Sequence, residues 1–431
     1  MTAVVGILNK QAVAIAADSA VTISGSNGRK IFNQANKVFT LSKFHPVGIM
    51  IYNSASFMGT PWETIIKIYR KNLALNRFNT VKEYQEDFIG FLKSKNYYSN
   101  QDDEGSYFLS FAQNLMQRVV QNSLQNNRHL LNDQTPKKKE ELLTLLEAKI
   151  ESYILQFETE QNYCEEFIDY SYADFNSSKS SLVDQLINQI FTENGYSVSE
   201  LLGIKIKQLI YVYLRTKESN TDFTGIIFTG FGENEIYPSL IPINISFAVG
   251  DRLRFYIDDD RVEQISKNND GAICPFAQTD VINTILTGID PKLDDIYNQN
   301  FSTYFSKYNQ AILDILGEHH PELAAQIRGI NIEELVNEYA DKNLETKQTN
   351  YINPLMNAVS YLSKEDLAEM AESLIYLTYL KRRITFAEES VGGPVDVAII
   401  SKGDGFIWIK RKHYFKPELN QYFFQNYLNN L

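Results

Sequence analysis

Cysteine is nearly absent from this chain. Its 431 residues include only Cys164 and Cys274, which excludes the disulfide framework that stabilises many small secreted domains. Neither residue has a histidine near it in the sequence, so we expect both to be small buried residues. Such sparse use of cysteine suits a reducing compartment and predicts a cytoplasmic protein.

Histidine is scarce as well, with five residues scattered along the chain. The adjacent pair His319-His320 cannot share a helix face in the way that two metal ligands at i and i+4 do. The run Asp258-Asp259-Asp260 lacks the glycine and the terminal glutamate of a calcium loop. Gly230-Phe231-Gly232 is not followed by the rest of a phosphate-binding motif. The sequence therefore predicts no metal ion and no cofactor.

Basic residues and long apolar runs are also in short supply. Lysine and arginine number 41 against 53 aspartates and glutamates, which gives a net charge of -12. A nucleic-acid partner requires a basic surface, so this balance argues against one. No stretch approaches the roughly eighteen apolar residues of a membrane span, and the N-terminus lacks the pattern of a signal peptide. We expect neither a nucleic-acid partner nor a membrane.

What the chain does have is Thr2, directly behind the initiator methionine. A threonine hydroxyl becomes a useful nucleophile when the residue's own free α-amine acts as its base, and the ordinary pKa of such an amine, about 7.7–8.0, leaves part of it neutral in the cell. Taken alone, a threonine here more often simply opens a strand. The segments 3–8 and 12–17 are apolar and lie either side of a short polar turn. They predict a hairpin that brings Asp18 back toward Thr2.

Two further short strands are expected at 36–41 and 47–52, with Lys37 at the start of the first. Taken separately, Asp18 is best interpreted as a turn carboxylate and Lys37 as a solvated surface lysine. Together with Thr2 they form a possible site. An ammonium group at Lys37 would lower the proton affinity of the Thr2 amine by like-charge repulsion, and Asp18 would hold Lys37 in place.

Three short segments in this region carry a family resemblance: Thr2 behind a lone methionine, Ala16-Ala17-Asp18-Ser19, and Asn36-Lys37-Val38. They resemble the proteasome β-subunit and its bacterial peptidase relatives, in the N-terminal-nucleophile hydrolase superfamily. Three later segments are similar to parts of the same family: 225–230 to its mid-chain core strand, 275–278 to the start of its next core helix, and 363–397 to its last long helix, Gly-Gly pair and closing strands.

The resemblance implies an α+β fold, a four-layer αββα sandwich in which two antiparallel sheets pack face to face between layers of helices. It also implies that Thr2 is the catalytic nucleophile, with Asp18 and Lys37 beside it. A peptide or protein would be the substrate, and the subunits would assemble into a homo-oligomeric ring. Nothing in the sequence identifies an adaptor or an ATPase partner.

Around the nucleophile, the chain departs from the family pattern. The family's Asp-x-x-Ser-Gly-Gly is represented by Glu388-Glu389-Ser390-Val391-Gly392-Gly393, in which glutamate replaces aspartate and Ser390 is one place out of register. No serine precedes Pro275, where the family has a second supporting serine. The glycine whose amide forms the oxyanion hole aligns with Asn53, and a backbone N–H survives that change.

Family positions also suggest a pocket for the side chain that precedes the cleaved bond. It would be lined by Val21, Ala35, Met50 and Ser54, most of which are apolar. The resemblance therefore implies a preference for apolar side chains at this substrate position.

The remaining length predicts a core that is interrupted twice. Core segments are expected at 1–75, 197–288 and 363–431, with mainly helical insertions at 76–196 and 289–362. Within the first insertion, hydrophobic periodicity indicates helices near 81–92, 107–126, 137–158 and 181–191. Core helices are expected at 61–75, 197–217 and 275–286. Strands are expected at 236–247, 252–257, 395–401 and 405–410.

Three functions remain open from the sequence. The first is a proteasome-like threonine peptidase. The second is an amidase that uses the same three residues on a small molecule. The third is a catalytically inactive scaffold subunit, suggested by Val391 and by the missing serine. The insertions could line an entrance, set the size of a ring or bind an adaptor.

Overall fold

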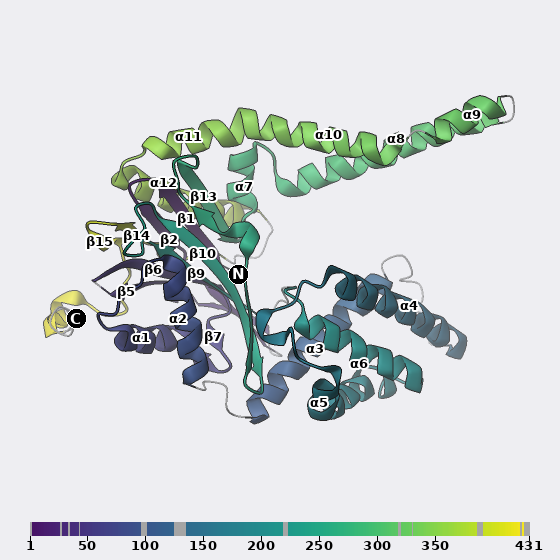
Figure 1. Ribbon diagram of the computed structural model, residues 1–431, viewed down its shortest axis with the longest axis horizontal. Helices are drawn as coiled ribbons and strands as arrows, with labels where there is room; N and C mark the ends of the chain where they lie inside the picture. Colours follow the sequence, from purple (N-terminus) through teal and green to yellow (C-terminus); the bar gives the residue numbers. More distant parts are fainter. Residues whose placement is uncertain are drawn as a thin grey trace. The chain divides into compact units, whose positions relative to one another are not determined.

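In the computed structural model, the chain forms two compact units. The residues it describes are 2–25, 28–32, 35–42, 44–95, 101–124, 135–218, 223–317, 320–329, 331–385, 391–422 and 425. The first unit comprises Met1–Met50, Thr229–Leu240 and Glu263–Leu431, and the second comprises Ile51–Phe228 and Ile241–Val262. Helices and antiparallel sheets make up both (Figure 1). The α+β class expected from the sequence is therefore confirmed.

The first sheet lies wholly within the first unit. Its strand order is β13-β1-β2-β14-β15, and its strands are β1 (Ala3–Asn9), β2 (Val13–Ala17), β13 (Gly271–Ala277), β14 (Asp396–Ser401) and β15 (Gly405–Lys410). Every residue of β1 and β2 is buried, because helices cover one face of the sheet and a second sheet covers the other. The two strands pair antiparallel from Val4 opposite Ala17 to Leu8 opposite Val13. The predicted hairpin is confirmed.

The helix expected at 275–286 is wrong in its first part. Residues 275–277 belong to β13, which pairs with β1 so that Pro275 lies opposite Val5 and Ala277 opposite Ala3. The helix, α7, spans only Asp280–Thr287. Proline has no N–H to give to a ladder, and it is tolerated here because β13 is an edge strand of the sheet.

The second sheet has the strand order β11-β10-β9-β6-β5, with β12 also paired to β10. Its strands are β5 (Val38–Ser42), β6 (His45–Asn53), β9 (Thr224–Gly230), β10 (Ser239–Val249), β11 (Arg252–Ile257) and β12 (Glu263–Gln264). The boundaries between the two compact units fall within β6, β9 and β10. Two short hairpins complete the strands: β3 (Val21–Gly25) with β4 (Gly28–Phe32), and β7 (Ser56–Phe57) with β8 (Thr60–Pro61).

Within the first unit, the two sheets pack face to face through glycines. A methyl group on Gly48 of β6 would stand 2.8 Å from Ile400 Cδ1, on the first sheet, and 2.9 Å from Phe406 Cε2. A methyl group on Gly6 of β1 would stand 2.8 Å from Leu240 Cδ1, on the second sheet. Protein cores are packed closely enough that such sites hold no further atom. Glycine at these positions sets the spacing of the sheets.

Helices cover the outer face of the first sheet. The helices of this unit are α7, α8 (Pro291–Gly317), α9 (Pro321–Arg328), α10 (Ile332–Lys347), α11 (Asn353–Tyr361) and α12 (Lys364–Ile384). Of these, α12 carries Leu367, Ala371 and Ile375 into the buried cluster that also contains Val5 and Ile7 of β1. Ser363 caps α12, since its hydroxyl accepts the Asp366 N–H while the Asp366 carboxylate accepts the Ser363 N–H.

The second unit contains the segment 76–196, which the sequence predicts to be a helical insertion. The helices of this unit are α1 (Trp62–Leu73), α2 (Val81–Ser94), α3 (Gln101–Ser123), α4 (Pro136–Glu160), α5 (Tyr172–Ile187) and α6 (Glu200–Arg215). All the helices expected here are present, although α3 and α5 begin earlier than predicted. Helices α1 and α2 pack on β9, where Trp62 Nε1 donates to Thr224 Oγ1 at 2.7 Å and the rings of Phe88 and Phe228 lie 5.4 Å apart. Among the described residues, no helix is both long and apolar enough to cross a bilayer.

Gly48→Ala and Gly90→Ala make the same chemical change in opposite environments. At Gly48 the added methyl group meets three side-chain ends between the sheets, and overpacking of this kind costs about 1–3 kcal/mol. Gly90 lies within α2 with no atom inside 4 Å of the added group, and alanine favours a helix over glycine by ~0.5–1 kcal/mol. Thermal unfolding should show a lower midpoint for Gly48→Ala and an equal or higher one for Gly90→Ala. A lower midpoint for Gly90→Ala alone would contradict this packing.

Candidate active site

The carboxylate of Asp18 gathers four donors in the first unit. Asp18 directly follows β2 and is 1% exposed. Its Oδ1 accepts the Ala3 N–H at 3.0 Å and Lys37 Nζ at 2.6 Å. Its Oδ2 accepts the N–H of Ala20 at 3.1 Å and of Gly392 at 3.0 Å. A buried carboxylate is tolerated only when it is paired and hydrogen-bonded in this way.

Lys37 lies just before β5 and is buried with its partner. Besides Asp18, its Nζ donates to the Ala20 carbonyl oxygen at 2.5 Å. Burial lowers the pKa of Lys37 below its ordinary value, while the Asp18 carboxylate opposes that shift. The ammonium group is thus separated from bulk water and held in one position.

Thr2 is connected to this ion pair through the backbone. It is 3% exposed and immediately precedes β1. Its carbonyl oxygen accepts the Gln278 N–H at 3.2 Å, and the next residue, Ala3, donates its N–H to Asp18. The predicted return of Asp18 to the start of the chain is confirmed. The structure brings Thr2, Asp18 and Lys37 into one buried group, and their catalytic roles stay predictions.

The Gly-Gly segment near the C-terminus completes the surroundings of Asp18. The Ser19 N–H donates to the Gly392 carbonyl oxygen at 3.1 Å, and the Ser19 hydroxyl donates to the Pro394 carbonyl oxygen. Sequence reasoning placed the support for the site at Glu388 and Ser390, which lie outside the described residues. The contact that the structure does show is made by the backbone of Gly392. A backbone donor leaves no side-chain pattern in a sequence, although the glycine pair was a visible marker.

A second buried ion pair lies next to the first. Asp396 of β14 lies opposite Ala17 of β2, and Ala17 is the residue that precedes Asp18. Its Oδ1 accepts the Lys412 N–H at 2.9 Å, and its Oδ2 pairs with Lys412 Nζ. The exposed fractions of the two side chains are 4% and 10%. The Lys412 charge adds to the lowering of the Lys37 pKa, and the Asp396 charge opposes it. The two pairs therefore form one electrostatic group.

Sequence reasoning missed this second pair. A lone aspartate at the start of the apolar run 397–400 is a signal that a partner must exist, because a charge is rarely buried unpaired. Lys412 follows the next strand and carries no local signal that would single it out. Only the fold shows that Lys412 is the ion-pair partner of Asp396.

The residues predicted to line a substrate pocket are distributed over both units. Val21 and Ala35 are half-buried in the first unit, and the Ala35 N–H donates to the Ser19 carbonyl oxygen at 3.1 Å. Met50 is fully buried, with its terminal methyl group toward Gly6. Ser54 is half-buried in the second unit. Their role in a pocket stays a prediction.

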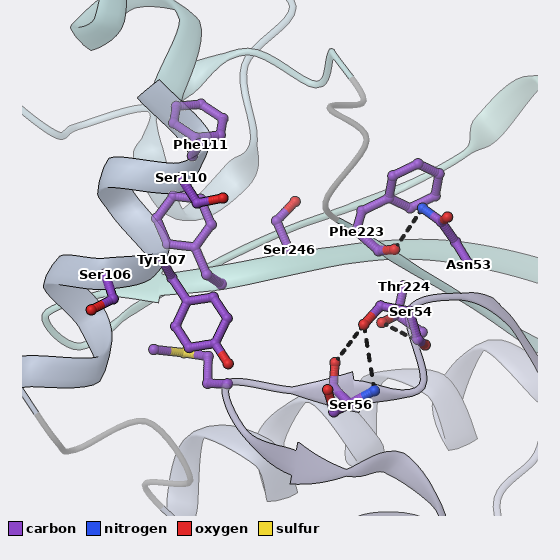
Figure 2. Close-up of a pocket in the computed structure, with 12 residues that line it drawn as sticks. Asn53, Ser54, Ser56, Ser106, Tyr107, Ser110, Phe111, Phe223, Thr224 and Ser246 are labelled. Atoms are coloured by element: carbon purple, nitrogen blue, oxygen red, sulfur yellow. Dashed lines mark hydrogen bonds between the residues drawn. The ribbon is translucent and has the colours of Figure 1, made fainter. Parts of the chain in front are cut away.

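Asn53, the predicted oxyanion residue, ends β6 in the second unit. Its φ angle is 71°, in the left-handed region. Its side-chain amide donates to the Phe223 carbonyl oxygen at 2.8 Å (Figure 2). Glycine adopts this conformation most readily, and asparagine is among the few other residues that do so. Asn53 thus adopts a backbone conformation that glycine would also adopt readily.

Both cysteines are buried thiols, as expected from the sequence. Cys274 lies on β13 opposite Gly6. Within the described ranges, no three histidine, cysteine, aspartate or glutamate side chains lie together so as to hold a metal ion.

Comparison with known proteins adds little to this geometry. No protein-family model and no curated protein matches the chain. Among solved structures, a mutant of Anbu from Hyphomicrobium sp. strain MC1 aligns with 100% of this chain and 93% of its own, at 11% identity and a TM-score of 0.24. Anbu from Yersinia bercovieri, described as an ancestral beta-subunit, aligns with 99% and 95%, at 10% identity and a TM-score of 0.27. Superpositions this loose leave the chain's own contacts as the basis for any function.

Asp18→Asn should lower the free energy of unfolding far more than Asp404→Asn, a matched change at the surface. It removes the charge that holds buried Lys37, and breaking a buried pair in this way costs about 3–5 kcal/mol. Asp404 pairs with Lys364, but those side chains are 59% and 44% exposed, and pairs of that kind contribute at most ~1 kcal/mol. Thermal unfolding of the two variants should therefore show a large drop only for Asp18→Asn. Equal drops would mean that the Asp18 site is not the compensated buried pair described above.

Proposed function

We propose that this protein is a threonine-type N-terminal-nucleophile hydrolase of the proteasome-like kind, which cleaves peptide bonds with Thr2 after removal of Met1. The observation that carries the proposal is the buried group around Asp18. One oxygen of this carboxylate holds both Lys37 Nζ, at 2.6 Å, and the amide of the residue next to Thr2, at 3.0 Å. A purely structural ion pair has no need to lie at the first peptide bond of the mature chain.

The chemistry requires no group beyond the threonine itself and its neighbours. Thr2 Oγ attacks the carbonyl carbon of the substrate's peptide bond, and the Thr2 α-amine accepts the hydroxyl proton directly or through one water. When the tetrahedral intermediate collapses, the amine returns that proton to the leaving nitrogen. Water then hydrolyses the ester formed on Thr2 and regenerates the free hydroxyl.

Lys37 and Asp18 adjust the α-amine for this task. An amine that must act as base has to be neutral, and a nearby ammonium group lowers its proton affinity. Asp18 orients Lys37 and compensates the cost of burying it. The second pair, Asp396 with Lys412, contributes to the same local field.

Stabilisation of the oxyanion is assigned to the backbone N–H of Asn53. Oxyanion holes work because donors already point at the place where negative charge develops. The left-handed φ of Asn53 supports this assignment, since it preserves a backbone conformation that glycine would otherwise supply. The family roles of Glu388 and Ser390, near the amine, are retained here only as part of the proposal.

The fold supports the same proposal. The first unit contains a helix layer, α11 and α12, followed by two sheets in face-to-face contact. In the second unit, α1 and α2 pack on β9 of the second sheet. The four-layer αββα sandwich itself is carried over from the family resemblance. The peptide substrate, the homo-oligomeric ring and the apolar pocket of Val21, Ala35, Met50 and Ser54 rest on the family resemblance alone.

Cleavage of a peptide library by the Met-free protein tests the proposal. Thr2→Ala removes the nucleophile and should reduce kcat/KM by at least ~10³-fold, whereas Thr2→Ser keeps a hydroxyl and should retain measurable activity. Apolar residues should be favoured immediately before the cleaved bond. Cleavage after acidic or basic residues alone would reject the apolar pocket. Activity confined to non-peptide amides would indicate a small-molecule amidase, and function unaffected by Thr2→Ala would indicate a scaffold.

The second ion pair gives a prediction in pH. Lys412→Met leaves an extra negative charge near the site, which raises the pKa of the Thr2 amine, so the acidic limb of kcat/KM against pH should move to higher pH. Asp396→Asn leaves an extra positive charge and should move the same limb to lower pH. Both variants lose one buried partner, so their stability falls in the same direction. If the acidic limbs of the two variants move in the same direction, or do not move, the Asp396–Lys412 pair does not act on the Thr2 amine.

A further inference from the structure

The peptide group between Thr2 and Ala3 is held at both of its polar atoms. Its N–H, on Ala3, donates to Asp18 at 3.0 Å, and its carbonyl oxygen, on Thr2, accepts the Gln278 N–H at 3.2 Å. A peptide group is planar, so contacts at both polar atoms fix the orientation of the whole group. Gln278 therefore orients the backbone beside the proposed nucleophile together with Asp18.

The backbone that presents Gln278 to Thr2 has an uncommon conformation. Ala277 is the last residue of β13 and lies opposite Ala3, and its φ angle is 64°, in the left-handed region. Alanine rarely adopts this region, because its Cβ then lies too close to the backbone carbonyl oxygen. Such a conformation persists only where the surrounding structure holds it in place. The contacts made by the next residue, Gln278, are placed to do so.

Arg382, in the last turn of α12, holds the side chain of Gln278. Its Nε donates to Gln278 Oε1 at 2.6 Å, and its Nη2 pairs with Asp280, the first residue of α7. The guanidinium group is planar and rigid, so these two bonds fix the positions of their acceptors relative to each other. Gln278 is itself buried, at 7% exposed. Arg382 thus clamps both ends of the segment 278–280.

Helix α12 provides a firm support for this clamp. Thr378, one turn before Arg382, is fully buried, and Leu374 and Ile375 belong to the core cluster that also contains residues of β1. The helix therefore packs on the same strand that begins directly after Thr2. A side chain on such a helix has little freedom to move relative to β1.

We propose that Arg382 is a positioning residue, which acts through Gln278 to hold the Thr2 backbone in the orientation that the reaction needs. The proposal rests on the proposed hydrolase function. A nucleophile that is displaced by about 1 Å can lose ~10²-fold in rate. Asp18 fixes one side of the first peptide group, and Arg382, through Gln278, fixes the other.

Lys381 offers a matched control, since it precedes Arg382 and pairs with the same carboxylate. Within the described residues, its ammonium group pairs with Asp280 at 3.1 Å and with Asp290 at 2.8 Å, and makes no bond to Gln278. Arg382→Gln and Lys381→Gln each remove one positive charge from Asp280. Only the first of them also removes the support of Gln278.

Hydrogen exchange tests the positioning without relying on catalysis. The Gln278 amide donates to Thr2, so its exchange rate reports on that contact. Measured relative to the amides of β2, this rate should rise by at least ~10-fold in Arg382→Gln and stay within about twofold in Lys381→Gln. Normalisation to β2 removes any loss of global stability that the two variants share.

Peptide cleavage tests the consequence for the reaction. Arg382→Gln should lower kcat by ~10–100-fold and leave KM within about twofold, because it misplaces the nucleophile without altering a substrate contact. Lys381→Gln should leave both constants within about twofold. Gln278→Met removes the acceptor for Arg382, so adding Arg382→Gln to this variant should change kcat little further.

The outcomes separate this proposal from the hydrolase proposal. Unchanged exchange at Gln278 in Arg382→Gln, or equal effects of Arg382→Gln and Lys381→Gln, would overturn the positioning role. So would faster exchange with an unchanged kcat. If the protein with its own sequence cleaves no peptide, the hydrolase proposal fails, and the exchange rates alone decide whether Arg382 positions the Thr2 backbone.

Discussion

The buried carboxylate of Asp18 is the constraint on which the site depends. Four segments of the first unit have to meet at this one group: the start of β1, the turn at Ala20, Lys37 before β5, and Gly392 before β14. Each donor offsets part of the cost of burying a negative charge, so loss of any one leaves the others undercompensated. The same contacts fix the backbone beside Thr2. Stability and the proposed chemistry therefore share one set of hydrogen bonds.

Much of this arrangement could be predicted from short-range patterns. Two apolar runs separated by a short polar turn were enough to predict the β1–β2 hairpin and the return of Asp18 to Thr2, and periodicity was enough to predict the helices of the segment 76–196. The helix start predicted at 275–278 was wrong. Pro275 and Ala277 are compatible with either a helix start or an edge strand, and pairing with β1 decides between them. The pairing of Asp396 with Lys412 could not be predicted from the sequence, because only the fold brings the two residues together.

The two units present contrasting polar environments. Around Thr2, two lysine–carboxylate pairs are buried side by side and create a strong local field. In the second unit, by contrast, a cavity of about 420 Å³ beside Asn53 has an uncharged lining, and its polarity comes from hydroxyls, one of them bound to the buried guanidinium of Arg254 (Figure 2). A charged group is suited to setting the proton affinity of an amine.

The proposed chemistry requires that Thr2 present a free α-amine beside an activated hydroxyl. A reagent that forms an adduct only by reacting with both the α-amine and the hydroxyl of a threonine measures this directly. Mass spectrometry of the folded, Met-free protein should show one such adduct on Thr2 and none on Thr2→Ala. Absence of an adduct on folded protein whose N-terminus is confirmed to be Thr2 would contradict the account.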